Sequence, residues 1–204
     1  MIQSAVGIIA GVIAFVAFIP YVVSILKGET KPQRATFAIW SVIGLIIFFS
    51  YLASGARETV WTALAYAIVQ IGIFGLSFKY GMGGFSKLDM ICIGGAVLGI
   101  VGWITTKDPA IALYLSIFSE FLGYVPLFKK SYLHPRTENT LSWVIGLVAS
   151  CLNVFALTST QFNVVLYPVY VVLCDGLVVS LLVFSKHRVR HKETRVALLL
   201  PKSD

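Results

Sequence analysis

The sequence predicts an all-α membrane protein with seven membrane-spanning helices, and three observations lead to that class. Of its 204 residues, 58% are hydrophobic and only 12% are charged, which is too little charge for the surface of a soluble domain of this length. Apolar stretches of about 20 residues, the length that crosses a bilayer as a helix, recur with short polar gaps. Basic residues gather in alternate gaps, as they do on the cytosolic side of membrane proteins.

Seven stretches have the length and composition of a spanning helix. They cover about residues 4–26, 36–54, 59–79, 88–106, 110–128, 141–159 and 163–184. The rest of the chain, from residue 186 onward, is a basic tail, for which we expect a short helical extension and a mobile end.

The positions of the basic residues predict how the chain is oriented. All but two of the 16 Lys and Arg residues lie in the first, third and fifth gaps or in the tail, which share one face when the chain crosses seven times. The two exceptions, Arg57 and Lys107, fall on the opposite face. The positive-inside rule then places the amino terminus outside and the carboxyl tail in the cytosol. We expect a multi-pass protein of the plasma (inner) membrane, with the lipid bilayer and not nucleic acid as the partner of its net charge of +7.

Two parts of the chain look like copies of one another. Pro20 and Pro126 are each followed by a second proline, and Trp40 and Trp143 lie eight positions after that second proline. Because three helices leave the chain on the far side of the membrane, one more helix is needed before a second copy can insert in parallel. The predicted 3+1+3 organisation has a first three-helix bundle in residues 1–80, a linker helix in 81–109, a second bundle in 110–185 and a cytosolic tail in 186–204.

This organisation, with Pro20 and Pro126 near the cytosolic ends of the first and fifth helices, resembles the SWEET and PQ-loop (MtN3-like) superfamily of membrane transporters. The glutamine of the PQ motif is absent, since Tyr21 and Leu127 follow the two prolines, and the prolines that SWEETs carry in helices 2 and 6 are missing. The resemblance implies alternating access around hinges at Pro20 and Pro126, and it favours a sugar as the solute. Bacterial nicotinamide riboside transporters and KDEL-type retrieval receptors look similar in architecture.

Polar side chains near the centre of a span are the candidate binding groups, because a charge there costs about 2.5–3.5 kcal/mol on insertion scales. Gln70 and Asp175 lie at similar depths in the third and seventh helices, where the resemblance implies sugar-binding side chains, and Asn153 lies somewhat outside the middle of the sixth. We predict that these three line one solute pocket, with Tyr66 and Tyr170 offering rings for stacking. Simple hydrogen bonds between helices are the alternative.

Glu120 is the second carboxylate at membrane depth. It has no basic residue near it in the sequence at that depth, so a proton-coupling role is predicted for it, and the alternative is a protonated glutamate bonded to Ser116. Pro20 and Pro126 each lack an amide hydrogen and so are predicted hinges. Four tryptophans fit interfacial belts instead of a binding site: Trp40 and Trp143 at the inner boundary, Trp61 and Trp103 at the outer one.

The sequence favours transport over catalysis. It contains no GxSxG, HExxH or GxGD motif, so we expect no enzymatic activity, no cofactor and no metal site. We expect an alternating-access transporter of a small polar organic solute. The alternatives are a vitamin, nucleoside or amino-acid transporter of similar architecture and a membrane receptor or sorting protein that moves no solute, and a homo-oligomer is left open.

Overall fold

The computed structural model describes residues 2–53, 60–83, 86–106 and 109–199, and within them every long element is a helix. The seven α-helices are α1 (Ile2–Leu26), α2 (Arg34–Ala53), α3 (Val60–Tyr80), α4 (Lys87–Thr105), α5 (Pro109–Leu133), α6 (Thr140–Phe155) and α7 (Phe162–Leu199). A short 3₁₀ helix, Pro135–Thr137, precedes α6. The predicted all-α class and the order of seven helices are confirmed.

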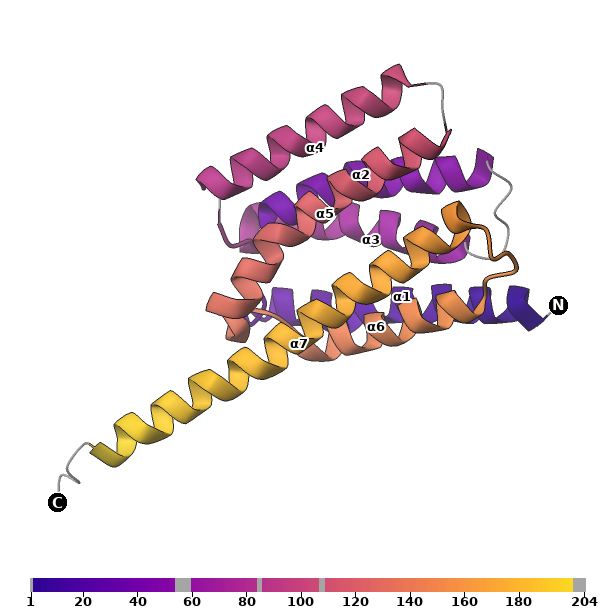
Figure 1. Ribbon diagram of the computed structural model, residues 1–204. Helices are drawn as coiled ribbons and strands as arrows, with labels where there is room; N and C mark the ends of the chain where they lie inside the picture. Colours follow the sequence, from indigo (N-terminus) through magenta and orange to yellow (C-terminus); the bar gives the residue numbers. More distant parts are fainter. Residues whose placement is uncertain (1, 54–59, 84–85, 107–108, 200–204) are drawn as a thin grey trace.

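The helices alternate in direction, so α1 begins at one end of the bundle and α7 ends beyond the other (Figure 1). We call α1, α2 and α3 the first set and α5, α6 and α7 the second set. In the first set α3 packs against both α1 and α2, and in the second set α7 packs against both α5 and α6. Between the sets α1 packs against α6 and α2 packs against α5. The first two helices of each set therefore form the contacts between the two sets.

Helix α4 lies at the periphery, mainly against α5 (Figure 1). Three of its glycines face α5 so closely that a methyl group would collide: a Cβ on Gly95 would lie 2.6 Å from Leu122, and one on Gly102 would lie 2.9 Å from Leu115. At Gly99 a Cβ would overlap the Ser119 hydroxyl. The glycines thus let the two helix backbones approach, as small residues do in membrane bundles.

The first helix shows how the chain divides apolar surface between protein and surroundings. Its buried face consists of the small residues Gly7, Ala10, Gly11, Ala14 and Ala17, followed by Tyr21 and Ile25 near its end. Its large apolar side chains, including Ile9, Val12 and Phe15, are about half exposed. A soluble protein would place these the other way round, so this helix is built for an apolar solvent.

Among the residues that the structure describes, three helical segments are long and apolar enough to cross a membrane: Ile2–Leu26, Ala63–Tyr80 and Phe162–His191. Arg34–Phe49 and Thr140–Phe155 are apolar but shorter than a full span within the described residues. The protein is therefore helical with several membrane-compatible segments, and the count of seven spans belongs to the proposed function below.

Three helix ends differ from the predicted ones by more than two residues. Helix α5 continues to Leu133, five residues past the expected end, and stops just before Pro135, whose ring disfavours helix in the preceding residue. Helix α6 ends at Phe155 instead of 159. Helix α7 continues through the charged tail to Leu199, as one rod that leaves the bundle in Figure 1. No Pro or Gly interrupts residues 177–199, and strong helix formers are frequent there.

Candidate functional site

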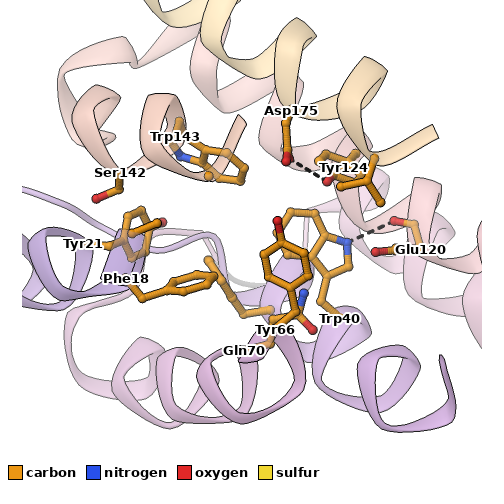
Figure 2. Close-up of a pocket in the computed structure, with 14 residues that line it drawn as sticks. Phe18, Tyr21, Trp40, Tyr66, Gln70, Glu120, Tyr124, Ser142, Trp143 and Asp175 are labelled. Carbon is orange, nitrogen blue, oxygen red and sulfur yellow. Dashed lines mark hydrogen bonds between the residues drawn. The ribbon is translucent and has the colours of Figure 1, made fainter. Parts of the chain in front are cut away.

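A cavity lies between the two sets of helices, with about 50 Å³ open to the centres of water molecules (Figure 2). That volume corresponds to roughly three to five waters. Seven aromatic side chains line it: Phe18, Tyr21, Phe37, Trp40, Tyr66, Tyr124 and Trp143. The polar groups Gln70, Glu120, Ser142 and Asp175 complete the lining together with a few small or aliphatic residues. The cavity thus combines a mostly apolar wall with a small number of polar groups, as small-molecule sites do.

Asp175 is the centre of a hydrogen-bond network that joins four helices. Its Oδ1 accepts a hydrogen bond from the Tyr124 hydroxyl at 2.9 Å, and its Oδ2 accepts one from Ser150 at 2.7 Å (Figure 2 shows the first). The Tyr66 hydroxyl lies 3.0 Å from the Ser150 hydroxyl. Because Ser150 has one hydrogen and gives it to Asp175, Tyr66 is the donor in that pair. The network ties α3, α5 and α6 to the carboxylate on α7.

Trp40 forms the wall of the cavity between α2 and α5. Its Nε1 donates to the backbone carbonyl of Glu120 at 3.0 Å, and its ring meets the Tyr124 ring edge-on at 4.5 Å (Figure 2). This position is available because residue 123 is glycine: a Cβ there would lie 2.5 Å from Trp40 Nε1. Thr36, one turn earlier on α2, donates to the Gly123 carbonyl at 2.8 Å. Helices α2 and α5 are therefore fixed against each other beside the cavity.

Two polar groups in the lining have oxygens that the described protein does not satisfy. The Glu120 side chain is 6% exposed, and its Oε1 accepts from Tyr167 at 3.3 Å, but no partner for Oε2 is found in the described part of the chain. The same holds for Oε1 of Gln70, which is 7% exposed and lies against Gly44 on α2. Buried polar atoms are almost always paired with protein, water or ligand, so these two oxygens are unsatisfied acceptors beside the cavity. Both are enclosed by protein atoms, Gln70 Oε1 by Gly44, so each side chain must rotate before a group in the cavity can donate to it.

At one end the cavity is bounded by Glu138, the residue that follows the 3₁₀ helix. Two lining residues bind its carboxylate: the Tyr21 hydroxyl donates to Oε1 at 3.3 Å, and Trp143 Nε1 donates to Oε2 at 3.1 Å. Lys130 at the end of α5 forms an ion pair with the same carboxylate, and the two side chains are 3% and 0% exposed. Glu138 therefore joins α1, α5 and α6 directly behind the cavity.

Lys130 also connects two loops. Its ammonium donates to the carbonyls of Lys31 and Thr137 besides Glu138, so each of its three hydrogens has an acceptor. Burial lowers the pKa of this ammonium, and the Glu138 carboxylate acts in the opposite direction. Lys186 on α7 adds a bond to the Glu138 backbone carbonyl at 3.1 Å. We call this end of the bundle, where residues 27–33 and 134–139 meet, the basic end.

The structure brings together four of the predicted site residues and leaves two outside. Gln70, Tyr66, Asp175 and Glu120 all line the cavity. Asn153 is buried in α6 near its end and is not among the lining residues. Tyr170 is also outside the lining and packs edge-on against the Tyr124 ring, with 6.2 Å between the ring centres.

The proposed hinge prolines are held within continuous helices. Pro20 lies in α1 and Pro126 in α5, and neither ends its helix. The Pro20 carbonyl accepts a hydrogen bond from the Asn139 side chain at 3.3 Å, across the boundary between the two sets. Pro20 is thus one residue from Tyr21 in the lining, and Pro126 is one turn from Lys130.

Sequence reasoning missed several residues of the site and assigned two of its tryptophans elsewhere. Tyr124 lies one turn from Glu120 on α5, and that spacing could have found it; Ser150 and Glu138 gave no comparable signal. Trp40 and Trp143 were assigned to an inner interfacial belt, which is wrong: Trp40 is 5% exposed, and both rings line the cavity. Trp61 is half exposed, as a belt residue would be, and the side chain of Trp103 lies outside the described residues.

No protein-family model, curated protein or solved structure matches this chain. What the chain does must therefore be argued from its own geometry.

Proposed function

We propose that this protein is a seven-span membrane transporter that moves a small polar organic solute by alternating access. The observation that carries the proposal is the cavity between the two sets of helices, whose lining includes Glu120 and Gln70 with buried oxygens that lack a partner in the described chain. A site of this kind, halfway along the helices and at the boundary of two similar halves, is where such transporters hold their solute.

A comparison of the two sets supports the proposed internal repeat. Thr36 and Asn139 each lie four residues before a tryptophan of the lining, Trp40 and Trp143. Thr36 donates to a backbone carbonyl of α5 at 2.8 Å, and Asn139 donates to one of α1 at 3.3 Å. Thr36 in the first turn of α2 and Asn139, the N-cap residue of α6, thus make reciprocal bonds to the first helix of the opposite set. This reciprocity is expected of two parallel copies, with α4 as the linker between them.

The network around Asp175 fits a merely structural role as well, because both its oxygens already accept hydrogen bonds from Tyr124 and Ser150. A merely structural role does not account for Glu120. A carboxylate oxygen that is buried at this depth without a donor costs several kcal/mol unless a solute, a water or a proton satisfies it. Glu120 therefore favours a cavity that is occupied during the working cycle, and it remains the candidate for proton coupling.

Alternating access requires that the basic end open and close. The Glu138 cluster closes it, since Tyr21 and Trp143 belong to the cavity lining and bind Glu138 directly. Each proposed hinge lies beside a member of this cluster: Pro20 precedes Tyr21, and Pro126 lies one turn before Lys130. A small change of helix direction at these prolines would separate Tyr21 and Lys130 from Glu138 and open the cavity.

The proposed orientation places the basic end in the cytosol and the amino terminus outside, in a plasma (inner) membrane. A sugar is the solute that the SWEET resemblance favours, while an amino acid or a vitamin-like nucleoside also suits a cavity with acids, an amide and rings. Catalysis is not part of the proposal. A receptor or sorting protein would use the same cavity without moving its ligand.

Solute flux into sealed vesicles tests the proposal. The full chain is reconstituted into proteoliposomes, and uptake is measured for labelled sugars, amino acids and nucleosides against protein-free vesicles. We expect saturable uptake of at least one class, with exchange against the same unlabelled solute inside. A ligand that binds the purified protein but never crosses the vesicle membrane would instead identify a receptor.

A further inference from the structure

Among the described residues, the cavity lining contains acidic side chains but no basic ones. Glu120 and Asp175 both contribute carboxyl groups, while none of the lining residues in the described chain is Lys, Arg or His. The nearest basic cluster, around Lys130, lies behind Glu138, and its ammonium is fully used by Glu138 and the carbonyls of Lys31 and Thr137. When ionised, two acids at membrane depth without a basic partner create a negative potential in a surrounding of low dielectric constant, and a cation in the cavity stabilises that ionised form.

The aromatic rings of the cavity wall also favour a positively charged ligand. Trp40 meets the Tyr124 ring edge-on at 4.5 Å and the Trp143 ring at 6.3 Å, so three rings surround one part of the cavity (Figure 2). The face of an aromatic ring carries partial negative charge and attracts cations, tryptophan most strongly. Rings alone would also accept a neutral flat solute, but rings combined with carboxyl groups that have no basic partner in the described lining favour a positively charged one.

The unsatisfied atoms specify the hydrogen-bonding groups of the ligand. Glu120 Oε2 and Gln70 Oε1 are both acceptors, and neither has a donor within the described residues. Once these side chains rotate toward the cavity, a ligand that satisfies them must bring hydrogen-bond donors. A quaternary ammonium group brings none, whereas a primary ammonium or a guanidinium group brings several in addition to its charge.

From these features we infer that the cavity binds a small organic cation whose charge is carried by N–H groups, a primary amine or a guanidine. This inference rests on the proposed function and narrows its solute. Glu120 supplies the free acceptor and a counter-charge, Asp175 supplies a second counter-charge from its fixed network, and Trp40 and Trp143 cover the cationic group with their rings. The room for roughly three to five waters limits the enclosed group to a few non-hydrogen atoms in this conformation.

Matched pairs of small compounds test the inference on the purified full chain. Guanidinium and urea have nearly the same planar shape but differ in charge, and ethanolamine and ethylene glycol form a second such pair. Binding is measured through the midpoint of thermal unfolding as a function of compound concentration, because a ligand of the native state raises that midpoint. Glucose is included as the solute that the family resemblance favours.

We expect guanidinium and ethanolamine to raise the midpoint of the wild-type protein and urea and ethylene glycol, at equal concentration, to leave it unchanged. Glu120→Gln keeps the shape of the side chain and removes its charge, and should weaken the apparent affinity for guanidinium at least tenfold. Asp175→Asn should weaken it in the same direction. The control is Glu29→Gln, which removes an exposed acid from the loop at the basic end and should bind as the wild type does.

The inference is overturned if urea and ethylene glycol stabilise the protein as well as their charged counterparts, if glucose alone does so, or if both acid variants keep wild-type affinity. Solute uptake into vesicles tests the proposed function separately from this binding result. Guanidinium binding without uptake would support the cation site and argue for a receptor. Glucose uptake without any cation binding would support the transporter and overturn the cation site.

Discussion

The ammonium of Lys130 and the carboxylate of Glu138 form an ion pair from which water is excluded, and this pair holds the basic end of the bundle together. Lys130 lies in the last turn of α5, whereas Glu138 lies just before α6, and between them they contact Tyr21 on α1 and the loop at Lys31. Such a pair contributes little net stability, because desolvation of both charges offsets their attraction. Its loss on one side only is costly, which makes it a sensitive point for tests.

The first prediction concerns single and paired removal of these charges. Lys130→Met and Glu138→Gln should each lower stability by about 3–5 kcal/mol, because each leaves the opposite charge buried without its partner. The double variant should lose less than the sum of the two. Thermal unfolding in detergent measures all three, with Lys27→Met, an exposed lysine of the neighbouring loop, as the control. Additive losses in the double variant would show that the two side chains do not depend on each other.

A second prediction concerns the glycine beside Trp40. Gly123→Ala would place a methyl group 2.5 Å from Trp40 Nε1, so it should displace the indole, break its bond to the Glu120 carbonyl and cost about 1–3 kcal/mol. Gly75→Ala is the matched control, since nothing lies within 4 Å of its added methyl group, and it should be neutral or stabilising. Tryptophan fluorescence and thermal unfolding follow both variants. Equal effects of the two substitutions would contradict the close packing at Gly123.

Much of the fold could be predicted because the apolar stretches mark where the helices lie, and a residue's position within a stretch indicates its depth in the membrane. The seven apolar stretches coincide with the seven α-helices, and the depth argument that matched Gln70 with Asp175 placed both in one cavity. Depth does not report rotation about the helix axis. Asn153 and Tyr170 lie at suitable depths but outside the cavity lining, while Trp40, predicted for the interfacial belt, belongs to the protein interior.

The partners of the site residues could not be predicted for a related reason. The bonds from Ser150 and Tyr124 to Asp175 join three helices, and they depend on how α5, α6 and α7 pack. Likewise, Glu138 lies in a stretch that looks like an ordinary polar loop, and only the close approach of α1 and α5 makes it a buried acid. Single-sequence patterns carry no information on such long-range contacts.

Topology is open to a direct test with two reporters. A fluorescent or enzymatic reporter at the carboxyl end of the chain should report the cytosol, and one inserted in residues 55–59, which lie outside the described residues, should report the opposite side. The reason is the gathering of basic residues in residues 27–34, 79–87, 129–136 and the tail. Reporters that appear on the same side would rule out seven spans and, with them, the parallel repeat.

The hinge prolines give a prediction about rates. Pro20→Ala and Pro126→Ala should slow solute flux more than they weaken binding, because a hinge controls the exchange between conformations and the cavity controls affinity. Initial uptake rates and binding are measured on the same preparations. Pro168→Ala on α7 is the control, since that proline is buried away from the basic end and should leave flux unchanged. Equal loss of flux and binding would indicate misfolding, and unchanged flux would remove the hinge role.

The final prediction concerns Asp175, whose two oxygens accept hydrogen bonds from Tyr124 and Ser150. In Asp175→Asn the side-chain oxygen can still accept from Tyr124, and the amide can donate to Ser150, which then turns its own hydrogen toward Tyr66. The network survives and only the charge is lost. Asp175→Ala leaves the Tyr124 and Ser150 hydroxyls without their acceptor, at a cost of about 1–3 kcal/mol for each.

Uptake measurements therefore distinguish the two possible roles of Asp175, while thermal unfolding reports the stability of each variant. If the carboxylate pairs with a cationic solute, as inferred here, or carries a proton, both variants should lose uptake while Asn remains the more stable protein. If Asp175 only binds a neutral solute by hydrogen bonds, Asn should keep substantial uptake and Ala should not. Wild-type uptake and affinity in both variants would leave Asp175 a structural residue and remove it from the solute site.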